Sequence, residues 1–196
     1  MIGIYGGSFN PIHKGHTRLA QALCRRGLVD EVWFMVSPLN PLKQNQQDDI
    51  LDYDVRLRLA RMATARSRHL QVSDFESHLP IPSYTVHTLA ELEKAYAGKD
   101  FCLVVGGDNW ERFDRWYQAD YIRSHYDILV YGRGCNAGGV TVYHKDGSSQ
   151  HYPDFALYNI SSTEIRHALR AGNIDFARQW LHRNVLKTLK HLLNLS

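Results

Sequence analysis

The feature of this 196-residue chain that most constrains its fold is the alternation of short apolar runs with longer amphipathic segments. The runs are rich in Val, Ile, Leu and aromatic residues, as expected of parallel strands that are buried on both faces. The expected strands are Ile2–Tyr5, Val32–Val36, Leu70–Val72, Phe101–Val105 and Asp127–Tyr131, and the expected helices are Lys14–Arg26, Asp54–Arg66, Tyr84–Ala97 and Trp110–Ser124. This order predicts an α/β protein with a doubly wound parallel sheet, whose ligands bind beyond the carboxyl ends of the strands.

The pattern changes after the fifth expected strand. Gly132–Gly139 is rich in glycine and is expected to be a loop, whereas Val140–Tyr143 alternates like a short strand. Residues 162–195 are expected to form helices. Their boundary signals are a possible N-cap at Ser161 or Ser162, an acidic Glu164 in the first turn and a C-terminal stop at Gly172. Because no repeat or linker divides the chain, we expect a single domain over residues 1–196.

Bulk properties exclude several classes of protein. The formal net charge of +3 does not require a nucleic-acid partner. No charged and apolar leader precedes the first strand, and no apolar run has the length of a membrane span, so we expect a cytoplasmic protein without a membrane partner. The three cysteines are far apart and the histidines lack ligand spacing elsewhere, so neither a disulfide framework nor a protein metal site is predicted.

The most informative segment joins the first strand to the first helix, and it reads Gly6-Gly7-Ser8-Phe9-Asn10-Pro11-Ile12-His13-Lys14-Gly15-His16. Its two leading glycines let the backbone turn sharply and approach a ligand. The amides at the start of a helix favour anions. His13 and His16 are three residues apart and can share one side, and Gly15 leaves room for a ligand between them. The segment therefore predicts a phosphate-binding turn.

Two other nucleotide-binding patterns fail. The chain has no GxxxxGK[ST] sequence, which excludes a P-loop protein. The segment 132–137 matches a loose dinucleotide-binding pattern, but it leads into an expected strand instead of a helix. We therefore interpret that match as chance.

The glycine turn with His13-Lys14-Gly15-His16 resembles the nucleotidyltransferase superfamily that carries the (H/T)xGH motif. Further strings resemble the bacterial nicotinate mononucleotide adenylyltransferases within it: Ser37-Pro38-Leu39-Asn40-Pro41-Leu42-Lys43, Ser83-Tyr84-Thr85, Gly106-Gly107-Asp108 with Phe113 and Trp116-Tyr117, and Ile160-Ser161-Ser162-Thr163-Glu164-Ile165-Arg166. The resemblance implies a Rossmann-like nucleotidyltransferase fold with C-terminal helices. It also implies an enzyme that transfers the adenylyl group of ATP to nicotinate mononucleotide, releasing pyrophosphate and forming nicotinate adenine dinucleotide for NAD biosynthesis.

The resemblance also implies an ATP site. His13 and His16 would donate hydrogen bonds to the phosphates, Arg166 would clamp the β- or γ-phosphate, and Lys43 would place a charge on substrate phosphate. The expected ATP-binding residues are Gly6, Gly7, Ser8, Phe9, His13, Gly15, His16, Gly106, Asp108, Ser161, Ser162 and Arg166. Magnesium is expected only as the complex with ATP, because phosphates and water can hold most of its coordination shell.

The acceptor site implied by the resemblance needs an aromatic surface and donors for a carboxylate. Trp116 would stack on the pyridine ring, while Thr85 and Tyr117 would meet the carboxylate. The expected acceptor-binding residues are Asn10, Lys43, Ser83, Tyr84, Thr85, Asp108, Trp116, Tyr117 and Arg133. The attacking phosphate is largely ionised at neutral pH, since its second pKa is about 6, so no strong general base is required.

Each of these residues also has a simpler interpretation. Trp116 and Phe113 are three residues apart and could both be core residues, and Asp108 could only cap a helix. Solvent exposure is the simplest interpretation of Lys43. It is also the simplest for the basic run Arg56, Arg58, Arg61, Arg66 and Arg68.

The chain departs from the family pattern at several positions. Asn10 and His87 stand where the family often has Asp, and Ser8 replaces the commoner Thr. The usual proline near Leu181 is absent. These changes concern substrate contacts more than the class of reaction.

Two rival functions remain open at this stage. One is another adenylyltransferase of the superfamily, acting on 4′-phosphopantetheine or nicotinamide mononucleotide. The other is a nucleotide- or RNA-binding module without catalysis, for which strongly salt-dependent binding of nucleic acid would be expected. The oligomeric state and the degree of preference for the acid mononucleotide over the amide are not indicated by the sequence.

Overall fold

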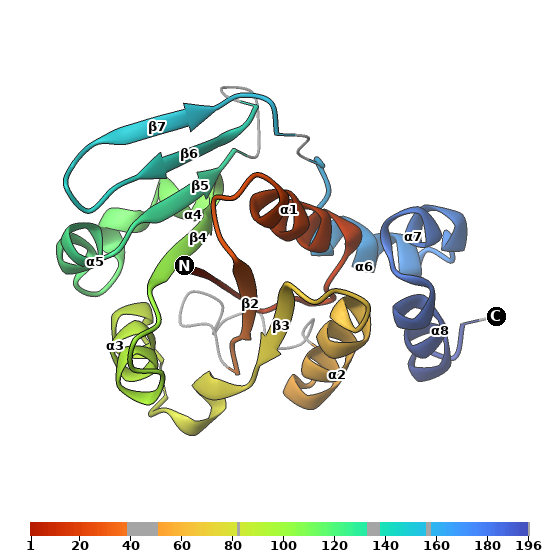
Figure 1. The fold of residues 1–196 in the computed structure, drawn as a ribbon. Coiled ribbons are helices and arrows are strands. Elements are labelled where there is room, and N and C mark those ends of the chain that lie inside the picture. Colours follow the sequence, from red (N-terminus) through yellow and green to blue (C-terminus); the bar gives the residue numbers. More distant parts are fainter. Residues whose placement is uncertain (39–50, 82, 133–137, 156–157, 196) are drawn as a thin grey trace.

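The computed structural model describes residues 1–38, 51–81, 83–132, 138–155 and 158–195. Over these residues the chain alternates strand and helix as predicted (Figure 1). The strands are β1 (Ile2–Gly7), β2 (Glu31–Val36), β3 (Leu70–Ser73), β4 (Phe101–Gly106), β5 (Ile128–Tyr131), β6 (Val140–Tyr143) and β7 (Ser149–Tyr152). The helices are α1 (Lys14–Arg25), α2 (Tyr53–Thr64), α3 (Thr85–Ala95), α4 (Gly107–Trp110), α5 (Ala119–His125), α6 (Ser162–Arg170), α7 (Ile174–Trp180) and α8 (Arg183–Leu192), with 3₁₀ helices η2 (Phe75–His78) and η3 (Phe113–Arg115).

The described strands form a seven-stranded sheet in the order β3-β2-β1-β4-β5-β6-β7. The first five strands in the chain are parallel, and β6 and β7 add an antiparallel hairpin at one edge. The strands β2 and β3 lie on one side of β1, whereas β4 and the later strands lie on its other side, so the strand order reverses between β1 and β4. In doubly wound sheets the crevice beside such a reversal is where ligands bind.

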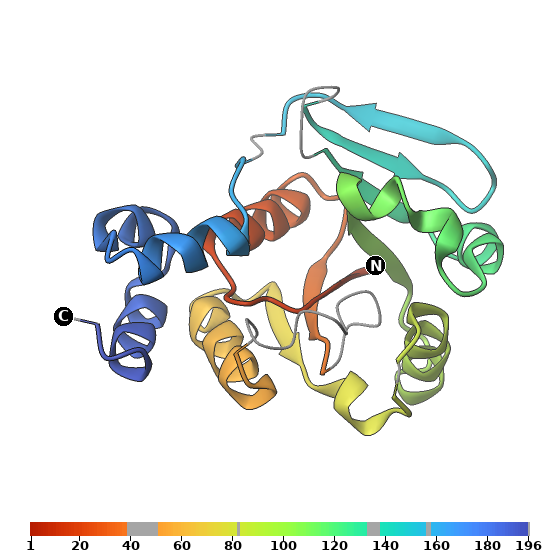
Figure 2. The ribbon, with the colours of Figure 1, turned by 180° about the vertical axis from the view of Figure 1, so that it is seen from behind.

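Helices cover both faces of the sheet, and each face has its own apolar cluster. Alternate side chains of β2 point to opposite faces: Phe34 belongs to the cluster beneath α1, α2 and α8, while Trp33 and Met35 belong to the cluster beneath α3 and α5. Figure 2 shows that α6, α7 and α8 lie outside α1 and α2, on the same face of the sheet. The apolar runs therefore form strands that are buried on both faces, as predicted.

The structure corrects the expected helix over Trp110–Ser124. That segment divides into α4, η3 and α5, because Trp116 is extended and Gln118 has a left-handed backbone with φ of 54°. An α-helix cannot pass through such a residue without ending. In this broken segment Phe113 is fully buried in the core, whereas Trp116 is only partly buried.

The edge strand β7 was also absent from the sequence prediction. Its residues, Ser-Gln-His-Tyr, are polar and mostly exposed, so they give no apolar alternation to detect. They pair with β6 through the backbone ladder and through one side-chain hydrogen bond, between Thr141 and His151 at 2.9 Å. The predicted limits of α6 are confirmed, since Ser161 forms a capping box with Glu164 and Gly172 follows the helix with φ of 69°.

The C-terminal helices are tied to the segment that begins α1. The Lys14 ammonium donates to the carbonyl oxygens of Arg178 and Gln179 at 3.0 and 2.9 Å, at the end of α7. A cation at the C-terminal end of a helix is favourable because the terminal carbonyls lack helical partners. Thr17 of α1 also hydrogen bonds to His182, with 2.9 Å between Oγ1 and Nε2.

Candidate active site

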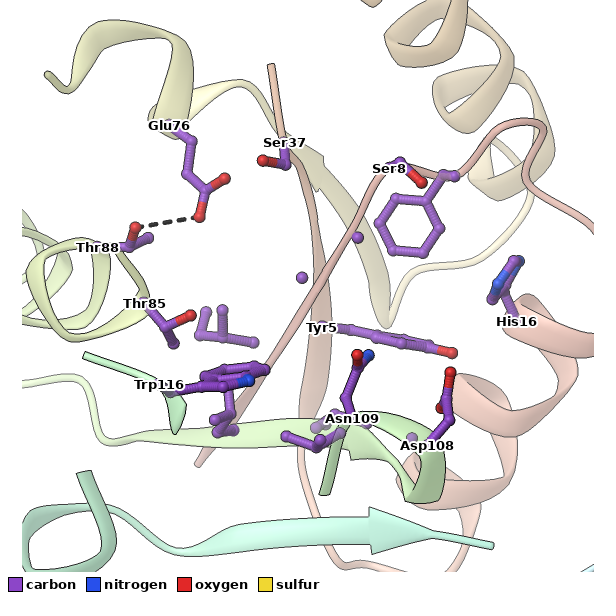
Figure 3. Close-up of a pocket in the computed structure, with 18 of the residues that line it drawn as sticks. Tyr5, Ser8, His16, Ser37, Glu76, Thr85, Thr88, Asp108, Asn109 and Trp116 are labelled. Carbon is purple, nitrogen blue, oxygen red and sulfur yellow. Dashed lines mark hydrogen bonds between the residues drawn. The ribbon is translucent and has the colours of Figure 1, made fainter. Parts of the chain in front are cut away.

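A cleft of about 390 Å³ opens at the carboxyl ends of β1 and β4, beside the reversal in strand order. Figure 3 shows walls from the glycine turn, the end of β4, the start of α3 and the segment around Trp116. The start of α6 also lines the cleft. The predicted site residues that line it are Gly6, Gly7, Ser8, Phe9, His16, Ser83, Tyr84, Thr85, Gly106, Asp108, Trp116, Tyr117, Ser161 and Ser162. Segments that are far apart in the sequence thus meet at one cleft.

His16 borders the cleft from the first turn of α1. The backbone N–H of His13 donates to Nδ1 of His16 at 3.3 Å. A backbone amide can only donate, so this bond places the proton of the neutral imidazole on Nε2. The ring also packs edge-on against Phe9 and Tyr5, at centroid distances of 5.2 and 5.9 Å. The imidazole is therefore fixed in both orientation and tautomer.

His13 and Gly15 occupy a second layer behind His16. The His13 ring is 1% exposed and stacks on the His16 ring with 3.6 Å between centroids. A side chain at position 15 would lie 2.9 Å from both the His13 ring and Ile160, so the glycine is required by packing within the protein. This corrects the expectation that Gly15 leaves room for a ligand, since protein atoms fill that space.

The start of α6 is fastened to the glycine turn by two hydrogen bonds. Arg166 donates from Nη1 to the carbonyl oxygen of Asn10 at 2.8 Å, and the Ser162 hydroxyl donates to the carbonyl oxygen of Pro11 at 3.0 Å. Arg166 also reaches the Thr163 hydroxyl, and burial lowers the pKa of its guanidinium. Neither Arg166 nor Asn10 lines the cleft, so their predicted substrate contacts stay predictions. The Asn10 side-chain oxygen accepts from the Leu51 amide at 3.0 Å.

Arg56 holds the turn from the opposite side, and the structure overturns its interpretation as a solvated residue. It is 2% exposed and donates to four backbone carbonyl oxygens, those of Ser8, Ser37, Pro38 and Leu51, at 2.7–3.1 Å. The loops after β1 and β2 are thereby joined through one guanidinium. Arg56 lies four residues before Ala60, so the two share the buried face of α2. This spacing is the sequence signal that could have identified Arg56 as buried.

The end of β4 supplies the middle of the cleft. Asp108 follows Gly106 and directs its carboxylate into the cleft, close to the Tyr5 hydroxyl and His16 (Figure 3). The N-cap of α4 is Gly106, so Asp108 is not the capping residue. A Cβ at position 106 would lie 2.7 Å from Oδ1 of Asp108 and 3.0 Å from the Tyr131 hydroxyl, so a side chain there would displace one of these groups. Asn109 also points into the cleft and was missed by the sequence analysis.

Aromatic residues form the other end of the cleft. Trp116 packs on the buried Phe113 at a centroid distance of 4.9 Å and presents its indole to the cleft, where Thr85 begins α3. The Tyr84 and Tyr117 rings lie 4.9 Å apart at the mouth, and His87 contacts both. His87 therefore packs with these two aromatic rings at the mouth of the cleft.

Two charged residues of the cleft were not found from the sequence. Glu76, in η2, is 8% exposed and accepts a hydrogen bond from the Thr88 hydroxyl at 3.0 Å. Burial raises the pKa of its carboxyl group, against the opposing effect of hydrogen bonds from Thr88 and Ser37. Arg115 lines the cleft beside Trp116. Both residues lie in 3₁₀ turns whose position cannot be read from apolar periodicity.

Lys43 and Arg133, two of the predicted substrate-binding residues, lie outside the residues that the structure describes. Among the described residues, no group of three or more His, Cys, Asp or Glu side chains is arranged to bind a metal ion. None of the helices in the described part of the chain has both the length and the apolar character needed to span a bilayer.

Comparison with known families gives a match over most of the chain. The model of the family described as cytidylyltransferase-like matches residues 4–168. A protein of Bacteroides thetaiotaomicron, named probable nicotinate-nucleotide adenylyltransferase, is 44% identical over 99% of this chain and 93% of its own length. The protein of the same name from Bacteroides fragilis is 45% identical over 95% of this chain and 90% of its own length.

Comparison with solved structures supports the same fold. The nicotinic acid mononucleotide adenylyltransferase of Plasmodium falciparum, complexed with NaAD, aligns with a TM-score of 0.76 and 18% identity, covering 100% of this chain and 98% of the other. The same enzyme complexed with APC aligns with a TM-score of 0.75 over the same shares of the two chains. At this level of identity the likeness shows the fold alone.

Proposed function

Since this chain belongs to the nicotinate-nucleotide adenylyltransferase family, we propose that its cleft binds ATP and nicotinate mononucleotide end to end and joins them with release of pyrophosphate. The observation that carries the proposal is the single cleft with a glycine turn and a fixed imidazole at one end and a stacking surface at the other. The phosphates that react would meet between these ends, near Asp108 and Asn109.

The triphosphate would lie over the glycine turn and the starts of α1 and α6. His16 would donate from Nε2 to the α-phosphate, because its Nδ1 is already engaged by the His13 amide. The hydroxyls of Ser161 and Ser162 are bound to Glu164 and to the Pro11 carbonyl oxygen. Their part in binding phosphate would therefore fall to backbone amides in the first turn of α6.

Arg166, His13 and Asn10 would act mainly by holding this arrangement in place. His13 stacks behind the His16 imidazole, and Arg166 binds the carbonyl oxygen of Asn10 within the turn. A direct clamp by Arg166 on the β- or γ-phosphate remains part of the proposal, as do contacts from Lys43 and Arg133 to substrate phosphate.

The acceptor would occupy the aromatic end. Trp116 would stack on the pyridine ring, Thr85 and Tyr117 would meet the nicotinate carboxylate, and Asp108 would accept hydrogen bonds from ribose hydroxyls. The helix α3 begins at Thr85, so its first backbone amides favour a carboxylate there. Arg115 adds a cation to the same lining.

The reaction would proceed by in-line attack of the acceptor phosphate on the α-phosphorus of ATP. The P–O bond to the β-phosphate breaks, pyrophosphate leaves, and no covalent intermediate with the protein is required. Because the attacking phosphate is already an anion, catalysis rests on alignment and on neutralising charge. Magnesium enters as part of the MgATP substrate and screens the phosphates of the leaving group.

The decisive experiment is a panel of acceptors supplied with ATP and magnesium, with pyrophosphate release as the measurement. Nicotinate mononucleotide should give the highest kcat/KM, followed by nicotinamide mononucleotide, with 4′-phosphopantetheine inactive. The proposal fails if nicotinate mononucleotide is the poorest acceptor. It also fails if the protein binds ATP but releases no pyrophosphate, whichever acceptor is supplied.

A further inference from the structure

Glu76 places a carboxyl group inside the acceptor end of the cleft. It extends from η2, which follows β3 at the carboxyl edge of the sheet, and Figure 3 shows its carboxyl group and the Trp116 indole on either side of Thr85, both directed into the cleft. Asp108, the other acidic side chain in the lining, follows β4 and lies near His16. The two acidic groups therefore lie in different parts of the cleft.

The described residues hold the Glu76 carboxyl group by hydrogen bonds from hydroxyl groups. The Thr88 hydroxyl donates to Oε1 at 3.0 Å, and the Ser37 hydroxyl is a second hydrogen-bond partner. Within the described residues no Lys or Arg side chain forms an ion pair with this carboxylate. Burial of an ionised carboxylate is unfavourable unless a cation accompanies it, so a cationic ligand would remove an existing electrostatic penalty.

The ring of a pyridine mononucleotide is such a cation, because the nitrogen that bears the ribose is quaternary and permanently charged. A ring stacked on Trp116 would present one face to the indole, which attracts a cation through its π system. Its remaining surface would face the side of the cleft that holds Glu76.

We propose, resting on the function proposed above, that Glu76 is the counter-ion of the pyridinium ring and selects acceptors with a cationic ring. Together, Trp116 and Glu76 would recognise the charge of the ring, while Thr85 and Tyr117 recognise its carboxylate. This recognition applies equally to the acid and the amide mononucleotide, because both carry the same ring charge.

Two other roles for Glu76 make different predictions. A purely structural role, in which Glu76 only anchors α3 through Thr88, would affect folding but not the choice of acceptor. A carboxyl–carboxylate hydrogen bond to nicotinate would affect the acid mononucleotide but not the amide. The experiment must therefore vary the ring charge while keeping the carboxylate and phosphate.

The test compares nicotinate mononucleotide with its reduced dihydropyridine form, which keeps the carboxylate and phosphate but has an uncharged ring. Glu76→Gln preserves the size of the side chain and its hydrogen bonds. We expect the variant to raise the KM for nicotinate mononucleotide by about tenfold or more and to leave the inhibition constant of the reduced form within about twofold. Glu76→Asp should retain more affinity than Glu76→Gln, since it keeps the charge.

Glu91→Gln is the matched control, because Glu91 is a half-buried residue of α3 that pairs with Lys94 and does not line the cleft, and it should leave both constants unchanged. Equal changes for the two ligands in Glu76→Gln, or no change in either, would overturn the inference, and so would a better KM for Glu76→Gln than for Glu76→Asp. If the unaltered protein releases no pyrophosphate with nicotinate mononucleotide, the proposed function has failed, which is a separate result.

Discussion

The two ends of the cleft are built in different ways. The phosphate end is one continuous segment, Gly6 to His16, fixed by Arg56 on one side and by Arg166 and Ser162 on the other. The acceptor end is assembled from η2, the start of α3 and the turn around Trp116, and its Tyr84 and Tyr117 rings are exposed. The phosphate end is tied by hydrogen bonds from side chains to backbone carbonyl oxygens, whereas the acceptor end combines aromatic packing with the hydrogen bond from Thr88 to Glu76.

The difference corresponds to what each end must do. Neutralising developing charge requires donors that do not move during the reaction, so the phosphate end gains from rigid hydrogen bonding. Recognition of a flat ring requires a surface that the ligand can reach, which aromatic side chains on short helices provide. We therefore expect changes at the phosphate end to lower kcat and changes at the acceptor end to raise the acceptor KM.

The largest effect should come from His16→Ala. Loss of the Nε2 donor should lower kcat by about 10²- to 10⁴-fold. Because the His16 ring is buried, its removal should also lower the melting temperature, but the variant should remain folded. Steady-state pyrophosphate release measures the rate, and circular dichroism verifies the fold. His87→Ala, at the acceptor end, is the control and should leave kcat within about threefold. A rate for His16→Ala close to that of the unaltered protein would remove the proposed distinction between the ends.

Arg56→Met should destabilise the protein by about 3 kcal/mol, because it leaves four backbone carbonyl oxygens without their buried donor. Urea unfolding followed by fluorescence measures the change. Arg58→Met, at an exposed position on the same helix, should change stability by less than about 0.5 kcal/mol. If the two variants were equally stable, the phosphate end would not be held in the way described.

Trp116→Ala should raise the acceptor KM by roughly 10- to 100-fold while changing the KM for ATP by less than about twofold. Trp116→Phe should recover much of the loss, since it restores an aromatic face. Initial rates with each substrate varied in turn provide the measurement. A parallel rise in both KM values would indicate that the Trp116 turn supports the whole cleft and not its acceptor end.

The smallest expected effect concerns stability at Glu76. Burial raises the pKa of this carboxyl above its ordinary value of 4.5, so its stabilising contribution is complete below that pH and is lost as the pH rises through the raised pKa. Glu76→Gln cannot titrate and should therefore gain stability relative to the unaltered protein as the pH approaches neutrality, by roughly 2–4 °C in melting temperature. Melting curves at several pH values measure this, and a gap that closes with rising pH would contradict it.

The order of the elements could be predicted because each parallel strand is buried on both faces and therefore apolar throughout. The glycine turn could be predicted because all of its functional residues are adjacent in the sequence. The acceptor end could be anticipated only from resemblance, since Thr85 and Trp116 belong to different segments. Trp116 lies in the turn between η3 and α5, where its own backbone is extended and that of Gln118 is left-handed, and apolar periodicity does not predict this turn.

Buried charge was the main source of error. Arg56 belongs to a basic run that resembles a solvated helix face, and only its tertiary contacts with carbonyl oxygens distinguish it from Arg58. Glu76 was missed for the same reason, since its hydroxyl partners Thr88 and Ser37 lie on other elements. Sequence patterns report where apolar residues gather, but they do not report which polar residues the fold encloses.

Lys14, between the two histidines of the turn, is bonded to carbonyl oxygens of residues that follow it by 164 and 165 positions. The position of α1, and therefore the orientation of the His13 and His16 rings, depends partly on its hydrogen bonds to the C-terminal helices. Removal of α7 and α8 would cut the anchor of the reaction centre although no atom of the cleft lining is deleted. An affinity tag or fluorescent protein fused after α8 should therefore be joined through a spacer, so that the contact between Lys14 and α7 is kept.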